Sequence, residues 1–295
     1  RAKGLQVACI IDADLPAWRC SDAGRIRQVL LNLLNNAIKF TQRGDVILRV
    51  SAGSAPDEVV CEVEDTGIGI APQALPTVFE RFQQAEQGTR RRFGGSGLGL
   101  TICREVVRAL GGELGVRSTL GQGSCFTARM RLPYALTRPD DAPALRSQAP
   151  VAYVEPHEPS AQALHQLLLR MGHRPCRCST AQDVVHLFHD EPTAGETPWL
   201  LVSQDTPGLV ELLEGVIDAV PPERVIGMAS QPWYPAEAAR DRVQMPRSVL
   251  KPVLRSALVS RFRSGTGAST QVPRPAVPND LPWQGQVLLV EDDLV

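Results

Sequence analysis

The chain has 295 residues, of which 43% are hydrophobic and 21% are charged, and its formal net charge is −1. This composition is ordinary for a globular protein, and the length allows two domains with cores of their own plus linkers. The near-neutral balance gives no general attraction to nucleic acid, so we expect no nucleic-acid partner. No apolar run approaches the ~18 residues of a membrane span, and no secretory signal opens the chain. We expect a cytoplasmic segment, with any anchor of a longer parent protein in the bacterial inner membrane lying outside it.

We also expect a piece of a longer protein, because predicted strands at 5–11 and 287–290 lie almost at the two ends of the sequence. The seven cysteines are scattered, odd in number and without C-x-x-C spacing, which is typical of reduced, mostly buried thiols. Cys176 and Cys178 fall on one face of a predicted strand. No His or Cys stands at ligand spacing from them, so the pattern argues against a metal site.

Strand and helix signals alternate through residues 1–134, which we take as the first domain. After the strand at 5–11, Ser21 or Asp22 can cap a helix. A strand is predicted at 59–64, a further helix ends near the glycines at 111 and 112, and a hairpin turn at 121–126 leads to the last strand. The first helix carries an apolar stripe predicted to face the core: Ile26, Val29, Leu30, Leu33, Leu34 and Ala37.

Residues 32–40, NLLNNAIKF, place polar side chains on a second stripe of this helix, with Asn32, Asn36 and Lys39 at i, i+4 and i+7. The Asn36 carbonyl oxygen is a hard ligand that suits Mg²⁺ already bridged by phosphates. Lys39 supplies a cation for those phosphates. An amphipathic helix with solvated amides gives the same pattern, so this segment alone leaves both interpretations open.

A carboxylate closes the strand predicted at 59–64, in the segment 65–70, DTGIGI. Asp65 can accept a hydrogen bond from the exocyclic amine of adenine, where guanine presents a carbonyl instead. Gly67 and Gly69 let the backbone approach the base closely. The alternative for this segment is a glycine-rich turn capped by Asp.

Glycines fill the segment 94–100, GGSGLGL, ahead of a predicted helix. They can expose N–H groups to a phosphate chain and permit a mobile lid. Arg90, Arg91 and Arg92 just upstream either screen phosphate charge or form a solvated basic loop.

In this order, the segments resemble the ATP-binding domain of sensor histidine kinases, whose fold is shared with DNA gyrase, the mismatch-repair ATPases and the heat-shock chaperone ATPases. Segments 32–40, 65–69, 79–82, 94–100 and 121–126 resemble the N, G1, F, G2 and G3 boxes. The resemblance implies a GHKL (Bergerat-type) α/β sandwich, in which a mixed sheet carries three helices on one face. It also implies ATP and Mg²⁺ as cofactors, with Asn36 on the metal. The site residues that it implies are Asn32, Asn36, Lys39, Phe40, Asp65, Gly67, Gly69, Ile70, Gly95, Ser96, Gly97, Leu98, Gly99 and Leu100.

One position separates two activities within that superfamily. Hydrolytic members carry a Glu at the position of Asn32 to activate water, and an amide cannot act as a general base at neutral pH. With Asn32 and Asn36 as the catalytic pair, the sequence therefore favours phosphoryl transfer to a protein histidine. A GHKL-type ATPase of another class and a non-catalytic, ATP-dependent regulatory module are the alternatives.

The acceptor histidine is expected outside the first domain, because all five histidines follow residue 156. Kinases of this family carry it on a helical hairpin immediately before the ATP-binding domain. The resemblance therefore implies an upstream dimerisation and phosphoacceptor hairpin as a partner, in a homodimeric parent.

Residues 135–150 are polar and proline-rich and are interpreted as a linker. Residues 151–263 form a second unit, in which strands alternate with helices. This pattern predicts a parallel sheet covered on both faces. The predicted strands lie at 151–154, 199–202 and 225–228, and the predicted helices at 160–171, 181–188 and 249–262, with a fifth strand expected ahead of Lys251.

The second unit resembles a degenerate form of the flavodoxin-like (βα)5 receiver domain of response regulators. Lys251 and the proline after it match the Lys-Pro pair of receivers. The phosphoacceptor position reads Ser203, with Asp205 two residues later, and the first acid pair is reduced to Glu155. We therefore expect this unit to take no phosphoryl group, with Lys251 paired to Glu155 or Asp205. The alternative is an active receiver in which Asp205 reaches the site.

Residues 264–284 hold four prolines and are interpreted as a flexible linker. Residues 285–295 resemble the first strand of a further receiver and its acid pair, Asp292 and Asp293. Downstream receiver or phosphotransfer domains are therefore expected partners.

Overall fold

The computed structural model describes residues 4–16, 18–80, 98–134, 150–190, 197–230, 247–264 and 287–289. They fall into two compact units, one formed by the residues up to 134 together with Val287–Leu289 and one by residues 150–264. Each unit has a hydrophobic core of its own. Within these ranges, no helix combines the length and the hydropathy that crossing a membrane requires.

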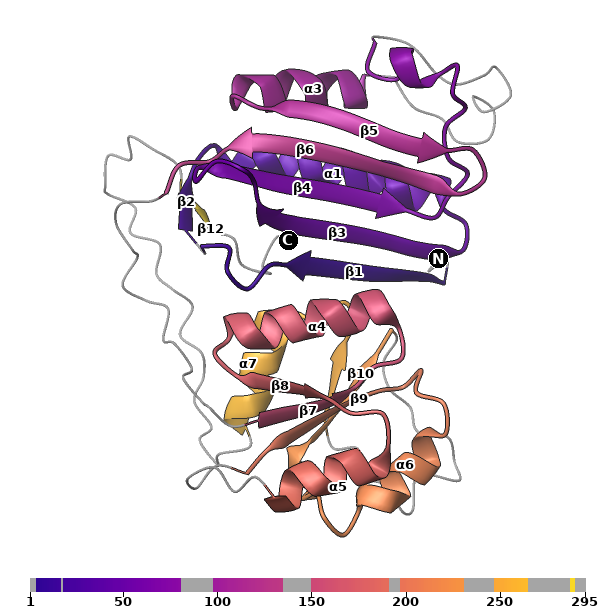
Figure 1. Ribbon diagram of the computed structural model, residues 1–295, viewed down its shortest axis with the longest axis vertical. Coiled ribbons are helices and arrows are strands. Elements are labelled where there is room, and N and C mark those ends of the chain that lie inside the picture. The colour runs from indigo at the N-terminus through magenta and orange to yellow at the C-terminus, as the bar shows by residue number, and fades with distance from the viewer. Residues whose placement is uncertain are drawn as a thin grey trace. The chain divides into compact units, whose positions relative to one another are not determined.

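A five-stranded mixed sheet forms the first unit, in the order β1–β3–β4–β6–β5. β1 and β3 pair in parallel, and the other neighbours pair antiparallel. Two helices, α1 and α3, contact each other and pack on one face of this sheet (Figure 1). These elements are β1 (Leu5–Ile11), α1 (Ala23–Phe40), β3 (Gly44–Ala52), β4 (Glu58–Asp65), α3 (Gly99–Ala109), β5 (Glu113–Thr119) and β6 (Gly123–Arg131), with a 3-10 turn at Leu75–Thr77.

The helix α1 forms where the sequence predicts it. Asp22 is its N-cap, and the Asp22 Oδ1 atom accepts a hydrogen bond from the Arg25 N–H at 3.0 Å. Each buried Val, Leu or Ile stabilises the packing on the sheet by about 1.5–3 kcal/mol. The predicted apolar stripe is confirmed, since Ile26, Val29, Leu30, Leu33 and Ala37 are buried and Leu34 packs against the same core.

A short two-stranded ribbon joins β2 (Trp18–Cys20) antiparallel to β12 (Val287–Leu289). Arg19 in β2 is fully buried, and its guanidinium lies 4.1 Å from the ring centroid of Tyr134. Its Nη1 atom donates to the carbonyl oxygens of Pro56 and Leu132, both at 3.0 Å. Arg19 thereby holds the chain where it leaves the first sheet.

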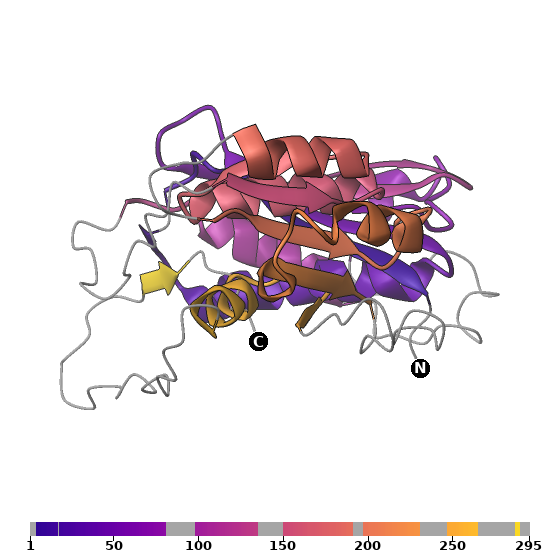
Figure 2. The same cartoon turned by 90° about the horizontal axis from the view of Figure 1, so that it is seen from below.

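The second unit is a parallel five-stranded sheet in the order β11–β10–β9–β7–β8, which in chain order is the 2-1-3-4-5 arrangement of flavodoxin-like folds. Helices α4 and α7 cover one face, and α5 and α6 cover the other (Figure 1, Figure 2). The predicted doubly covered parallel sheet is therefore confirmed. Its elements are β7 (Pro150–Val154), α4 (Glu158–Arg170), β8 (Arg174–Arg177), α5 (Ala181–Asp190), β9 (Trp199–Ser203), α6 (Leu209–Val216), β10 (Val225–Ala229), β11 (Ser248–Leu250) and α7 (Arg255–Ser264), with a 3-10 turn at Pro222–Arg224.

The helix predicted at 249–262 is wrong in its first six residues. Ser248–Leu250 form the edge strand β11 and pair with β10, and α7 starts only at Arg255. Pro252 explains the difference, because it lacks an N–H and disfavours helical geometry in the residue before it. The fifth strand expected ahead of Lys251 is present.

Candidate nucleotide-binding site

Asp65 ends β4 as a buried carboxyl with 6% of its surface exposed. Its Oδ1 atom accepts a hydrogen bond from the Gly67 N–H at 2.8 Å. Burial raises the pKa of the Asp65 carboxyl, and hydrogen bonds from the Gly67 and Ser124 N–H groups oppose that rise. The strand therefore holds one desolvated acceptor in a fixed direction.

The C-terminal end of α1 meets the Asp65 loop. A Cβ atom on Gly67 would lie 2.6 Å from the Phe40 carbonyl oxygen, so a larger residue there would separate the two segments. The Ile68 N–H also points at the Phe40 carbonyl, at 3.4 Å. The last turn of α1, which ends the predicted N box, is therefore in contact with residues 67–68 of the predicted G1 box.

The hairpin between β5 and β6 closes the other side of this loop. Gly69 has φ +67°, and a Cβ atom there would lie 2.1 Å from the Thr119 carbonyl oxygen. The Ile70 N–H donates to the Ser118 Oγ atom at 2.8 Å, and that hydroxyl lies 3.0 Å from the Ser124 Oγ atom. Glycine is required at position 69 because the conformation and the close approach both exclude a side chain.

Asn32, Asn36 and Lys39 are all partly exposed on α1. The Lys39 Nζ atom lies 4.9 Å from the ring centroid of Phe40. Because Asn36 precedes Phe40 by one turn, its amide and the Lys39 ammonium belong to the same end of α1 as the Asp65 loop. Asn36 and Lys39 of the polar stripe predicted for 32–40 therefore lie at the end of α1 that contacts the Asp65 loop.

The start of α3 brings the end of the predicted G2 box to Asn32. Leu98 is the N-cap, and a Cβ atom on Gly99 would lie 3.9 Å from the Asn32 Oδ1 atom. Leu100 packs against the core. Gly95, Ser96 and Gly97, the arginines at 90–92, and the acid pair Asp292 and Asp293 lie outside the described residues.

Several polar contacts of this region were not predicted from the sequence. The Thr101 hydroxyl donates to the Phe79 carbonyl at 3.0 Å and so links α3 to the predicted F box. The Phe79 ring lies edge-on to Phe126, with the centroids 6.3 Å apart. Thr101 follows the glycine run directly, and Ser118 and Ser124 flank the hairpin turn. In the sequence, only their positions next to the predicted boxes could have indicated that these three residues belong to the site.

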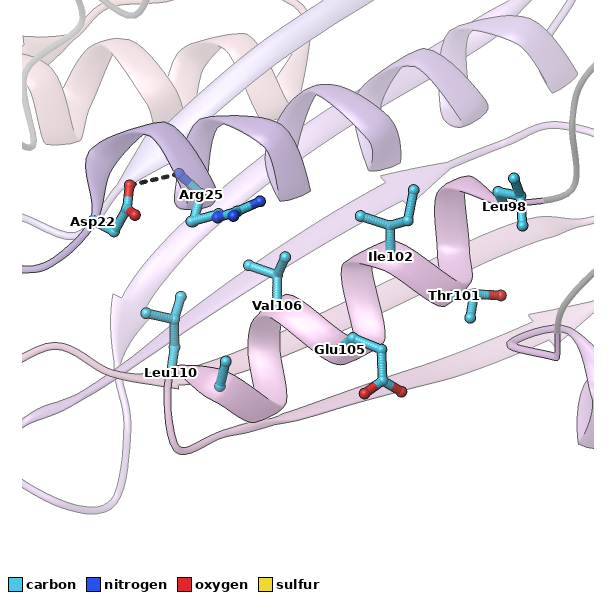
Figure 3. A pocket seen from close by; sticks show the side chains of 9 residues that line it. Asp22, Arg25, Leu98, Thr101, Ile102, Glu105, Val106 and Leu110 are labelled. Atoms are coloured by element: carbon cyan, nitrogen blue, oxygen red, sulfur yellow. Dashed lines mark hydrogen bonds between the residues drawn. The ribbon is translucent and has the colours of Figure 1, made fainter.

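A hollow of about 650 Å³ lies along α3 near the N-terminus of α1, and Figure 3 shows the side chains that line it. Ile102 and Val106 supply its apolar wall, with Asp22 and Arg25 from α1 and Glu105 at its rim. Of the predicted site residues it includes only Leu98. Among the described residues, the hollow therefore shares little of its lining with the predicted nucleotide site.

The second unit contains a separate cluster of charges after the ends of β7 and β9. The Lys251 Nζ atom lies 2.7 Å from Glu155 Oε2, 3.0 Å from Asp205 Oδ2 and 2.7 Å from the Ser203 Oγ atom. Glu155 and Lys251 side chains are only 1% and 6% exposed, and Ser203 is fully buried. The predicted pairing of Lys251 holds for both acids, because one ammonium with three donors meets three acceptors.

Residues 21–134 match the protein family described as "Histidine kinase-, DNA gyrase B-, and HSP90-like ATPase". The chain is also 34% identical over 227 residues to the sensory/regulatory protein RpfC of Xanthomonas campestris pv. campestris, covering 65% of this chain and 31% of RpfC. It is 42% identical over 173 residues to the autoinducer 2 sensor kinase/phosphatase LuxQ of Vibrio cholerae, covering 58% of this chain and 20% of LuxQ. The chain thus spans less than a third of either relative.

Among solved structures, full-length ShkA in complex with AMPPNP is similar to this chain, with 28% sequence identity and a TM-score of 0.60. The match covers 91% of this chain and 53% of ShkA, so it extends well beyond the first unit. Together with the buried acceptor Asp65 and the asparagines of α1, these similarities identify residues 21–134 as an ATP-binding domain of the sensor histidine kinase type.

Proposed function

We propose that this chain is the ATP-binding catalytic part of a hybrid sensor histidine kinase. In this role it donates the γ-phosphoryl group of ATP to a histidine on a dimerisation hairpin outside the chain, in a phosphorelay. The observation that carries the proposal is the convergence on Asp65. The end of α1, the Gly67–Gly69 loop and the β5–β6 hairpin meet around one buried acceptor, and Asn36 lies one turn before the Phe40 carbonyl that this loop contacts.

In this proposal some of the site residues bind the adenine base of ATP and the others bind its phosphate groups. Asp65 accepts from the adenine amine, and Gly67 and Gly69 admit the ring. Lys39 and the backbone N–H groups at the start of α3 bind phosphate oxygens. Asn32 lacks the basicity to activate water, which favours transfer to an imidazole over hydrolysis.

Mg²⁺ is proposed to arrive with the nucleotide. Among the described residues, no group of three or more His, Cys, Asp or Glu side chains could hold a metal ion alone. The partly exposed amide oxygen of Asn36 fits as one protein ligand to an ion that phosphates already coordinate. When bound, the ion would neutralise charge on the phosphates, and Asn36 would fix its position over the end of α1.

Calorimetry with ATP and GTP in the presence of Mg²⁺ tests the adenine assignment. We expect ATP to bind more tightly than GTP, and Asp65→Ala to remove that preference. Glu64→Ala is the matched control, because Glu64 is the neighbouring acid on β4 and its partly exposed carboxylate pairs with Arg49. Equal affinity for ATP and GTP would contradict the assignment, as would full ATP affinity in Asp65→Ala.

The second unit is proposed to be a degenerate receiver that contributes structure or protein contact without taking a phosphoryl group. Ser203 stands where a receiver needs an aspartate that attacks phosphorus and ligates Mg²⁺. The Lys251 ammonium already bridges Glu155, Asp205 and Ser203, which supports the proposal. Treatment of the whole chain with acetyl phosphate and Mg²⁺ should give no adduct by intact mass. A single adduct that Asp205→Asn abolishes would contradict this.

A further inference from the structure

The side chain of Thr101 joins the first turn of α3 to the segment 75–80 (Figure 3). Thr101 is 5% exposed, and its hydroxyl donates a hydrogen bond to the Phe79 carbonyl oxygen at 3.0 Å. The Arg104 guanidinium lies 6.0 Å from the centroid of the Phe79 ring. Because positions 101 and 104 share a face of α3, the helix contacts Phe79 through two neighbouring side chains.

Phe79 is itself fixed to the sheet. Its ring packs against the core of the first unit and lies edge-on to the buried Phe126 of β6, with the ring centroids 6.3 Å apart. The Glu80 N–H donates to the Thr77 carbonyl oxygen at 2.9 Å, which closes a turn around Phe79. The carbonyl that accepts from Thr101 therefore belongs to a segment that the sheet holds in place.

The start of α3 depends on this contact because no side chain caps the helix. Leu98 at the N-cap has no side-chain acceptor, whereas Asp22 caps α1. Further along α3, the buried Cys103 Sγ atom donates to the Val29 carbonyl oxygen of α1 at 3.8 Å. Loss of the Thr101 hydroxyl should therefore loosen the first turn of α3 and leave the rest of the helix packed.

We infer that Thr101 is a positioning residue, which holds the first turn of α3 where its backbone N–H groups meet the phosphates of ATP. The identity of the ligand rests on the proposed function, whereas the contact with Phe79 does not. N–H groups at a helix start bind phosphate in one direction, so a small displacement of the turn weakens the interaction. The adenine acceptor Asp65 lies on β4, so the effect of Thr101 should be confined to the phosphates.

The affinities of the whole chain for ATP with Mg²⁺ and for adenosine test this division. Thr101→Val keeps the shape of the side chain and removes its hydroxyl. It should weaken ATP binding about tenfold, the effect of one hydrogen bond, and leave the adenosine affinity within about twofold. Thr101→Ser keeps a hydroxyl and should recover ATP binding to within about threefold. Equal losses for ATP and adenosine in Thr101→Val, or an unchanged ATP affinity, would overturn the inference.

Thr127 provides a matched control on β6. Its hydroxyl donates to the Glu62 Oε1 atom at 3.2 Å. Because side chains alternate along a strand, Thr127 lies on the face of the sheet opposite Phe126. Thr127→Val removes the same group away from α3, and both affinities should stay within about twofold of the unmodified chain. A tenfold loss of ATP affinity in Thr127→Val would show a general effect of losing a hydroxyl, and would overturn the positioning role.

Amide hydrogen exchange in the nucleotide-free chain tests the contact by itself. The Ile102 N–H donates to the Leu98 carbonyl oxygen at 2.9 Å at the start of α3, and the Leu110 N–H donates to the Val106 carbonyl oxygen at 3.0 Å at its end. Thr101→Val should raise the exchange rate of the Ile102 N–H about tenfold and leave that of Leu110 unchanged. Unchanged exchange at Ile102 would overturn the inference. An unmodified chain that binds neither ATP nor adenosine would instead contradict the proposed function, and the exchange rates would still decide whether Thr101 holds the turn.

Discussion

Asp65 is a residue at which stability and binding oppose each other. Burial raises the pKa of its carboxyl, so the folded chain binds the proton more tightly than the unfolded chain. The stabilisation from this protonation is complete at low pH, and it is lost as pH rises through the raised pKa. At neutral pH the buried Asp65 carboxylate therefore lowers the free energy of unfolding. In its ionised form, however, it can accept a hydrogen bond from a ligand.

Asp65→Asn should separate these two effects. Its amide oxygen can still accept from the Gly67 N–H, but the charge is gone. We expect a higher melting temperature at pH 7 and a loss of ATP affinity of about 10- to 100-fold, the value of a hydrogen bond to a charged group. The gain in stability should shrink as pH falls below the Asp65 pKa. Thermal melts across pH and calorimetry check both parts; a less stable variant at pH 7 would refute the first.

Sequence patterns identified the candidate site residues, but they did not identify the residues that pack against the same segments and position them. Asp65, Asn32 and Asn36 stand in segments with recognisable spacing. Thr101 and Cys103 do not, because a hydroxyl or a thiol on an amphipathic helix has no distinctive pattern. Their contacts to Phe79 and Val29 join segments 22 and 74 residues apart, which only the packed fold brings together.

In the loops between the strands of the first unit, Gly69 and Gly121 both have positive φ, so alanine substitutions at the two positions can be compared directly. Gly69 has φ +67° and Gly121 has φ +81°, so alanine should cost about 1–2 kcal/mol at either position from backbone strain alone. A Cβ atom at 121 meets open space, whereas at 69 it would collide with the Thr119 carbonyl. Gly69→Ala should therefore destabilise more than Gly121→Ala and also weaken ATP binding. Denaturant titration of both variants checks this, and equal losses would contradict the predicted close packing of loop and hairpin.

The Lys251 cluster should also contribute to the stability of the second unit. Lys251→Met would leave the Glu155 carboxylate buried without its partner, which typically costs about 3–5 kcal/mol. Arg131→Met is the control, because the surface Arg131–Asp57 pair of the first unit should contribute at most about 1 kcal/mol. Chemical denaturation of the whole chain should show the loss in one unit only. A Lys251→Met effect no larger than the control would mean that Lys251 does not stabilise the cluster.

Element types were largely predictable, and one failure has a local cause. Periodicity identified α1 with its buried face and gave the position of α4, since one apolar stripe determines such a helix. The segment 249–262 has helical spacing throughout, yet its first two residues, Val249 and Leu250, pair with β10 as part of an edge strand. Hydrophobic periodicity does not show that Pro252 interrupts the helix. It also does not show that β10, which is distant in sequence, offers an edge with which Val249 and Leu250 can pair.

For the whole molecule, we propose that the first unit transfers phosphoryl groups to a histidine on a hairpin outside this chain. Incubation of the chain alone with labelled ATP should give no acid-labile, base-stable label. Addition of the parent's helical hairpin in trans should give such label on the hairpin, and Asn36→Ala should abolish it by removing the proposed Mg²⁺ ligand. Stoichiometric label on the chain alone, or hairpin label that survives Asn36→Ala, would contradict the proposed phosphoryl transfer.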